Sequence, residues 1–245
     1  MKKNIIPTIT KAGFIEKVEP VPNLIIGTTV GLVKNTNEDR AGCILDGNSL
    51  RICVADGHWG EAAAETIAQH WMKKKVVFPA NRNEALLEVM TIEEKLFKSF
   101  GKTNMNPNSD FTPEASFISI QIEMNTLKVI SFGDCRLLVT REGKVKIQLA
   151  TEETWLGAFS KMGLRNRISV RQGLVFEEIL LQEGDVVLIF TDGVDQCIYE
   201  KDTLSSQFLA KQTKTVAVKK VFDSIFGAVF VAGAEDNATL VVLKI

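Results

Sequence analysis

Aspartates at the ends of apolar segments are the residues of this sequence best suited to do chemistry. Asp56 follows LRICVA, Asp134 follows TLKVISFG, Asp192 follows DVVLIFT, and Asp236 precedes NATLVVLKI. Several carboxylates desolvated together are costly and repel one another unless a cation compensates them. Because neither a cysteine nor a histidine pair is placed to help, all-oxygen ligation favours magnesium, manganese or calcium over zinc.

Glycine accompanies three of these acids in the sequence. Gly57 follows the first aspartate, Gly133 precedes the second, and Gly193 follows the third. A glycine permits a tight turn and lets the backbone approach an ion or a ligand closely. A single Asp-Gly pair is most often only a turn, so the prediction of a site depends on the repeated pattern.

A second acidic cluster lies in GLVKNTNEDR, where Glu38 and Asp39 are adjacent and Lys34 and Arg40 flank them. This stretch is either a charged loop between two strands or a part of the site. We favour the second interpretation, because a basic residue beside acids suits a site that binds metal on one side and a phosphate oxygen on the other.

The elements that position these residues are mostly strands. Apolar segments predict strands over residues 24–33, 50–55, 115–124, 126–132, 135–140, 144–150, 174–181, 185–190 and 238–245. Helical spacing predicts helices over 64–71 and 86–100, with Leu86, Val89 and Met90 in the core, and 204–226 reads as a further helical block. The short turn REGK favours an antiparallel hairpin. We therefore predict one α+β domain over residues 1–245, an antiparallel sandwich with helices packed outside.

Charge and cysteine content narrow the class of protein. The 29 basic and 30 acidic residues nearly cancel, so we expect no nucleic-acid or membrane partner. The four cysteines lie far apart without metal-ligand spacing, and we expect buried, reduced thiols at Cys43, Cys53, Cys135 and Cys197. No apolar run approaches the ~18 residues of a membrane span. These features predict a cytoplasmic protein.

Five segments, GLVKNTNEDR, VADGHWG, SFGDCR, FTDGV and EDNATLVV, occur in this order along the chain. Together they resemble the motif series of the 2C-type metal-dependent protein phosphatases, the PPM family, over about Gly27 to Leu243. The resemblance implies two stacked antiparallel β-sheets flanked by α-helices, with a dinuclear metal site at one edge. It also implies hydrolysis of phosphoserine and phosphothreonine in protein substrates, opposing a serine/threonine kinase.

The resemblance assigns metal ligands residue by residue. Asp56 would bridge two Mn²⁺ or Mg²⁺ ions, and the Gly57 carbonyl and Glu38 would complete the protein ligands of one ion. Asp192 and Asp236 would hold the other ion. In this chemistry a water that bridges the two ions attacks phosphorus in line.

Four further residues receive roles from the same resemblance. Asp134, with Asp192, would bind a weaker third ion. Asp39 would orient metal-bound water from behind the ligands, and Lys34 would bind the substrate phosphate. His58 would be the general acid that protonates the departing serine or threonine oxygen, since an imidazole titrates in the useful range.

The sequence departs from the family pattern in several places. Lys34 stands where the family more often has an arginine, and Trp59 stands where it usually has glycine, so that a bulky aromatic would cover the site or narrow its entrance. Asp195 comes one residue early for a third-metal ligand. A frequent Asp-His pair is replaced by Glu152, Glu153 and Thr154. The segment 160–171 forms either a basic rim for acidic phosphopeptides or a solvated loop, with Lys161, Arg165, Arg167 and Arg171.

Two other functions fit parts of the pattern. A pseudophosphatase or regulatory binding module would keep the fold but turn over slowly, although retention of Glu38, Asp56, Asp192 and Asp236 argues against a decayed site. A calcium-binding structural domain would use the acids only to stabilise loops, and it predicts no need for a basic residue or a histidine beside them. The oligomeric state stays open.

Overall fold

The computed structural model describes residues 13, 15–101, 112–149, 154–158, 169–194, 206–214 and 217–245. Several sequence predictions fall outside these described residues, namely those for Glu152, Glu153, Lys161, Arg165, Arg167, Asp195 and Cys197.

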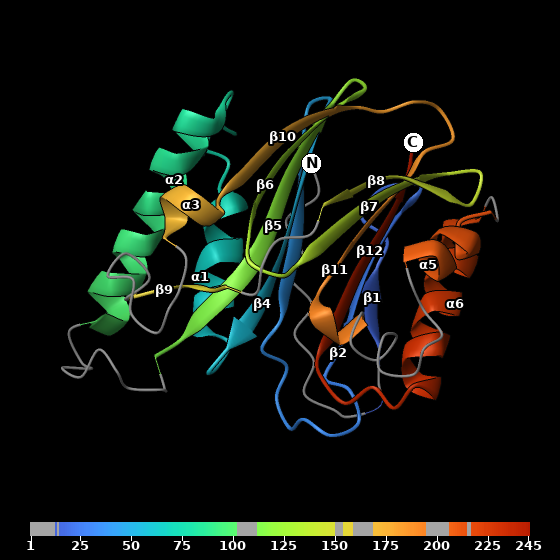
Figure 1. The fold of residues 1–245 in the computed structure, drawn as a ribbon, viewed down its shortest axis with the longest axis horizontal. Helices are drawn as coiled ribbons and strands as arrows, with labels where there is room; N and C mark the ends of the chain where they lie inside the picture. The colour runs from blue at the N-terminus through green and yellow to red at the C-terminus, as the bar shows by residue number, and fades with distance from the viewer. Residues whose placement is uncertain are drawn as a thin grey trace.

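Two antiparallel β-sheets stack face to face, and helices cover both outer faces (Figure 1). The first sheet has the strand order β1-β2-β12-β11-β7-β8, and the second has the order β10-β6-β5-β4-β3, with β9 paired to the start of β5. The predicted α+β sandwich is confirmed. The strands are Glu16–Val18 (β1), Leu24–Thr29 (β2), Arg40–Asp46 (β3), Ser49–His58 (β4), Glu114–Glu123 (β5), Thr126–Phe132 (β6), Arg136–Arg141 (β7), Lys144–Leu149 (β8), Leu156–Gly157 (β9), Val175–Leu180 (β10), Val186–Phe190 (β11) and Ala238–Lys244 (β12).

Helices pack on the sheets in two groups. In Figure 1, α1 (Ala62–Trp71) and α2 (Arg82–Leu96), with its π-helical extension η1 (Phe97–Gly101), lie beside the second sheet. The short α3 (Val170–Gly173) precedes β10, and α5 (Ser206–Gln212) and α6 (Val218–Val231) lie beside the first sheet. The predicted block 204–226 is therefore two helices, the second of which continues to Val231.

The α2 helix shows where helical spacing predicted the core and where it did not. The helix begins after Asn81, whose side chain caps the N-terminus by accepting a hydrogen bond from the Glu84 backbone N–H. Val89 is buried as predicted, on a face shared with Ala85 and Ile92. Met90 is exposed, which corrects the prediction, because it lies one residue, about 100° around the helix, from that face.

The central strands are apolar throughout because both of their faces are buried. On β11, Val187 and Ile189 belong to the cluster between the sheets, whereas Leu188 and Phe190 pack in the cluster that includes Phe222 of α6. This arrangement explains why such strands read as continuous apolar runs rather than as alternating ones.

The described cysteines match the prediction of buried thiols. Cys43, Cys53 and Cys135 are buried and free, and burial raises the pKa of Cys43 to about 11. Such thiols are protonated and unreactive at neutral pH. None of the described helices is long and apolar enough to cross a membrane.

Candidate active site

Strand register brings the predicted site residues to one end of the sandwich. Phe190 at the end of β11 pairs with Arg136 at the start of β7, which places Asp192 and Asp134 at the same edge. Ala238 at the start of β12 pairs with Thr29, the last residue of β2. The ends of these strands lie at the lower end of Figure 1, as does the end of β4.

Two glycines let separate motifs meet at this edge. A Cβ atom on Gly57 would lie 2.4 Å from the backbone oxygen of Glu38, and one on Gly193 would lie 1.8 Å from the backbone oxygen of Asn237. Either substitution would force the backbones apart. The glycines beside Asp56 and Asp192 therefore serve close packing between the chain segments that carry the acids.

Asn237 fastens the loop that carries Glu38. Its side-chain Oδ1 accepts a 2.8 Å hydrogen bond from the backbone N–H of Glu38, and its Nδ2 donates to the carbonyls of Val30 and Thr36. Through these bonds the start of β12 fixes the predicted metal ligand Glu38 beside the ends of the central strands.

Asp39 is buried at the centre of the site. Its Oδ2 accepts hydrogen bonds from the hydroxyls of Thr191 and Thr239, at 2.9 and 2.8 Å. Its Oδ1 is buried without a hydrogen-bond partner among the described residues. Burial raises the pKa of Asp39 to about 7, the two threonine hydrogen bonds lower it, and the charges of Asp192 and Asp236 raise it. A buried carboxylate oxygen without a hydrogen-bond partner favours binding of a proton or a cation.

Asp56 and Asp192 face each other directly. Burial raises the pKa of Asp56 well above its usual range, and the charges of Asp39, Asp192 and Asp134 raise it further. Burial, and then the charge of Asp134, raises the pKa of Asp192 to about 6, although its hydrogen bond with Asp56 opposes this shift. The carboxylates therefore crowd one another and raise each other's pKa.

The donors present are of the chemical type that hard divalent ions bind. They are carboxylate oxygens and backbone carbonyls, which Mg²⁺ and Mn²⁺ prefer. The unsatisfied Oδ1 of Asp39 and the mutual repulsion of Asp56 and Asp192 both favour positive charge in their midst. As they stand, no three acidic, histidine or cysteine side chains of the described residues converge closely enough to enclose one ion.

Lys34 contacts a predicted metal ligand. Its Nζ lies 3.1 Å from Oδ1 of Asp236, and both side chains are partly exposed. Burial lowers the pKa of Lys34, but the charge and hydrogen bond of Asp236 and the charges of Glu38 and Asp56 raise it overall. The lysine is thus a charged group at the rim of the acidic cluster, where a phosphate oxygen can reach it.

His58 ends β4 and is held from the neighbouring strand. Its Nδ1 lies 3.0 Å from Oε1 of Glu114, whose side chain is only 3% exposed, whereas that of His58 is 38% exposed. The two residues pair across β4 and β5. This contact fixes the imidazole ring through Nδ1.

Arg40 belongs to the scaffold. Its buried guanidinium binds the side chains of Glu61 and Glu65 and donates to the carbonyls of Asn37 and Asp39. It therefore fastens the acidic loop to α1, and the structure gives it no role toward a phosphate.

Several residues of the site escaped the sequence analysis. Glu114 became visible only through the pairing of β4 with β5, which no spacing in the sequence specifies. The two threonines that bind Asp39 follow β11 and lie in β12, within the motifs FTDGV and EDNATLVV, but threonines at strand ends are too common to signal a role. His70, the other histidine of the chain, contacts Glu88 and Lys95 between α1 and α2.

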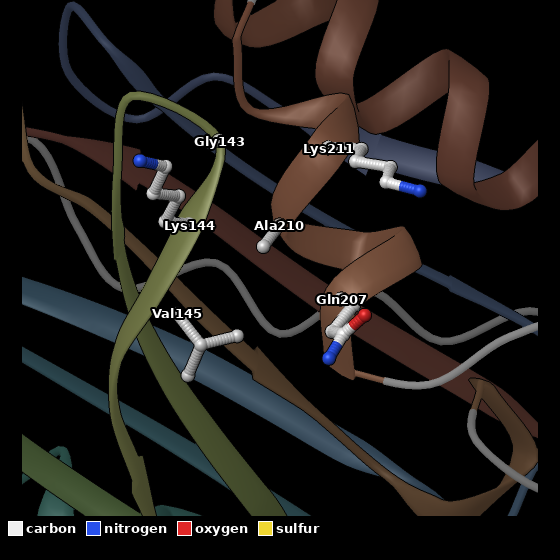
Figure 2. Close-up of a pocket in the computed structure, with 6 residues that line it drawn as sticks. All are labelled: Gly143, Lys144, Val145, Gln207, Ala210 and Lys211. Atoms are coloured by element: carbon white, nitrogen blue, oxygen red, sulfur yellow. The ribbon is translucent and has the colours of Figure 1, made fainter.

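A separate pocket lies away from these residues. Its volume is about 340 Å³, and Figure 2 shows it between the β7–β8 hairpin and α5, lined by Gly143, Lys144, Val145, Gln207, Ala210 and Lys211. The hairpin turn is at the opposite end of β7 from Arg136, which lies at the site. This pocket is therefore no part of the acidic cluster.

Comparisons with solved structures define the class of fold. Stp1, a serine/threonine phosphatase from Staphylococcus aureus, superposes with a TM-score of 0.70 over 94% of this chain and 97% of its own, at 13% identity. The Mycobacterium tuberculosis serine/threonine phosphatase PstP gives 0.65 over 91% and 97%, at 18% identity. PppA, a key regulatory component of T6SS in Pseudomonas aeruginosa, gives 0.65 over 95% and 99%, at 16% identity. The chain has the fold of bacterial PPM-type serine/threonine phosphatases.

The sequence supplies the family. Residues 86–245 match the family model of stage II sporulation protein E (SpoIIE). Because this match covers more than half of the chain, the chain belongs to this family. The matched range contains Asp134, Asp192 and Asp236 but not Glu38 or Asp56. No curated protein sequence matches the chain.

Proposed function

We propose that residues 1–245 form a single phosphatase domain that hydrolyses phosphoserine and phosphothreonine in protein substrates with two Mn²⁺ or Mg²⁺ ions. The observation that carries this proposal is the cluster of buried, mutually repelling aspartates beside a histidine that Glu114 holds in place. The five motifs occur in the order that the PPM family uses, and the fold is that of the PPM phosphatases.

Asp56, Glu38 and the Gly57 carbonyl would hold one ion, and Asp56, Asp192 and Asp236 would hold the other. Asp134, whose charge acts on both Asp56 and Asp192, would contribute to a third. When bound, the ions supply a water nucleophile at neutral pH and stabilise the charge that develops on the phosphoryl oxygens.

The side chains of the chain itself divide the remaining work. Asp39 is held through Oδ2 by two threonine hydroxyls, and its Oδ1, buried without a hydrogen-bond partner among the described residues, would orient a water. Lys34 attracts the substrate phosphate. His58, with Nδ1 fixed by Glu114, protonates the departing alcohol oxygen through Nε2, so that the product leaves as a neutral hydroxyl.

Partner and location follow from the same proposal. The substrate would be a phosphorylated protein, and a serine/threonine kinase would act on the same target. The buried free thiols are consistent with a reducing, cytoplasmic compartment.

The alternatives make different use of the same residues. A pseudophosphatase would bind phosphoproteins without turnover. A calcium-binding structural domain would need neither Lys34 nor the contact between His58 and Glu114. The 3.0 Å contact between these two side chains favours a catalytic site over a purely structural one.

The test is release of phosphate from a phosphothreonine peptide with Mn²⁺, with Mg²⁺ and with a chelator. We expect turnover that needs the metal and disappears in Asp56→Asn and Asp192→Asn. Protein that is folded and binds metal but releases no phosphate from several phosphopeptides would overturn the catalytic proposal and favour the regulatory module.

A further inference from the structure

Trp59 is an aromatic residue in an unfavourable backbone conformation. Its φ is +64°, in the left-handed region, and 41% of the residue is exposed. For a bulky side chain this region costs about 1–2 kcal/mol, and exposed apolar surface adds no burial in return. Partial burial of the indole therefore has a backbone cost to offset at this position.

The ring of Trp59 lies beside the imidazole of His58 in a tilted arrangement. Its centroid lies 4.6 Å from that of the imidazole, at an interplanar angle of 38°. Trp155 lies 4.8 Å from the same imidazole at 25°. His58 thus has two indole contacts in addition to its contact with Glu114.

Trp155 and Trp59 are carried by different kinds of element. Trp155 directly precedes β9, which pairs with Glu114 and Ala115 of β5, so it is placed by the same strand that holds His58. Trp59 follows β4 and precedes Gly60, which also has a positive φ of +104°. The more exposed indole is therefore carried by a tight turn at the rim of the site.

We propose that Trp59 is a specificity-determining residue whose exposed indole binds an apolar, preferably aromatic, side chain next to the phosphorylated residue of the substrate. This inference rests on the proposed phosphatase function. A substrate whose phosphate lies at the acidic cluster and whose departing oxygen lies at His58 brings its neighbouring residues over the turn that carries Trp59. Contact with an aromatic side chain there removes apolar surface from water and adds the geometry of an aromatic pair.

The charges around the turn disfavour an acidic neighbour. Glu61 lies two residues beyond Trp59 with a side chain that is 59% exposed. Glu61 is bound to the buried Arg40, so its charge is already engaged and gives less attraction to a basic substrate residue. An uncharged apolar side chain suits the indole best.

The experiment compares phosphothreonine peptides that differ only in the residue on either side of phosphothreonine, which is Phe, Ala, Arg or Asp. We expect kcat/KM with Mn²⁺ to be about two- to tenfold higher for Phe than for Ala. In Trp59→Gly this ratio should fall to about one, and in Trp59→Phe part of it should remain. The control Val231→Ala, which shortens an exposed apolar residue at the end of α6, should keep the wild-type ratio.

Folding and binding are followed separately. Glycine adopts a left-handed φ without strain, so Trp59→Gly should unfold within a few degrees of the wild type. Tryptophan fluorescence with phosphonate peptides, which cannot be hydrolysed, should show tighter binding of the Phe peptide to the wild type and no such preference in Trp59→Gly.

Peptide turnover tests the proposed phosphatase function, and binding of phosphonate peptides tests the role of Trp59. Absence of phosphate release from every peptide would overturn the proposed function, while the fluorescence would still decide the role of Trp59. Equal binding of all peptides, a preference for Arg or Asp, or a preference for Phe that survives in Trp59→Gly would overturn the inference.

Discussion

The two ends of β11 carry aspartates in opposite electrostatic settings. Asp185, just before the strand, is fully buried and receives two hydrogen bonds from Arg141, at 2.6 and 3.0 Å, and a third from the backbone N–H of Gln182. Asp192, just beyond the strand, has its pKa raised to about 6 by burial and then by the charge of Asp134. The ionised carboxylate is thus stabilised by its surroundings at the Asp185 end of the strand and destabilised at the Asp192 end.

This difference separates structure from function within a single element. A carboxylate that meets an arginine in bidentate geometry is satisfied by the fold and holds the chain together. Carboxylates that raise each other's pKa store an unfavourable interaction that a bound cation would relieve. The Asp185 end therefore contributes to stability, and the Asp192 end to binding.

The largest effect should come from exchanging the two aspartates for asparagine. Asp192→Asn removes a proposed ligand of the second ion, and we expect phosphate release to fall by about 100-fold or more. Asp185→Asn should keep the metal-dependent turnover but lose about 1–3 kcal/mol of stability, because Arg141 loses its charged partner. Peptide turnover and chemical denaturation, measured on both variants, check the contrast.

A smaller effect is expected where a side chain beside the carboxylates is changed but the charge of the cluster remains. His58→Ala removes the proton donor, and we expect kcat to fall about 100-fold for peptide substrates. Glu114→Gln keeps a hydrogen-bond partner for Nδ1 and should cost about tenfold. Because an aryl phosphate with an acidic phenol needs no proton on departure, its hydrolysis should suffer far less in His58→Ala. Equal losses for both substrates would argue against a general acid.

The pH dependence of stability should distinguish the two ends as well. The pKa of Asp39 is about 7 in the folded chain against an ordinary 3.8, so the folded state binds this proton more tightly than the unfolded chain does. Stability of the metal-free protein should therefore fall as pH rises from about 4 to about 7, and level off above that range. The raised pKa values of Asp56 and Asp192 act in the same direction.

The matched variant for this prediction is Asp39→Asn, which cannot ionise. Without metal it should melt several degrees above the wild type at pH 8 and close to it at pH 5. Mn²⁺ at pH 8 should raise the melting temperature of the wild type. The pKa of His70 is lowered by burial and by Lys95, so that residue costs stability as pH falls below about 6.5, in both proteins alike. Identical pH profiles of the two proteins would show that Asp39 is not the buried charge described here.

The smallest effect should come from Lys34, which lies at the rim. Lys34→Ala should raise KM for phosphopeptides by several-fold with a smaller change in kcat, because its contribution is attraction of the phosphate. Lys34→Arg should retain or improve KM, since a guanidinium can bind two phosphate oxygens at once. Steady-state kinetics at low and high salt would check both, and a KM that ignores either substitution would place the phosphate elsewhere.

Most of the fold could be predicted from the sequence, and so could the candidate acids. The contacts that hold those acids in place could not. Apolar runs and the REGK turn predicted an antiparallel sandwich, because strands buried on both faces appear in the sequence as continuous apolar segments. Met90 was misplaced because adjacent apolar residues on a helix point about 100° apart and local spacing does not say which one faces the sheet. Glu114 lies 56 residues from His58 in the chain, and only the pairing of β4 with β5 brings them together.

The closeness of motifs was likewise invisible in the sequence. The glycines were predicted to allow turns or approach to an ion. The structure adds close packing of Gly57 and Gly193 against the backbones of Glu38 and Asn237, and the approach to an ion stays a prediction. Such contacts depend on how distant segments pack, which residue types and spacing alone do not specify.

Equilibrium binding of Mn²⁺ by calorimetry tests the central claim most directly, with the wild type compared with Asp192→Asn and Asp185→Asn. The account predicts about two ions per chain for the wild type and for Asp185→Asn, and loss of at least one of them in Asp192→Asn. Absence of Mn²⁺ binding to the folded wild type, or equal binding by all three proteins, would contradict the assignment of the Asp192 end as a metal centre.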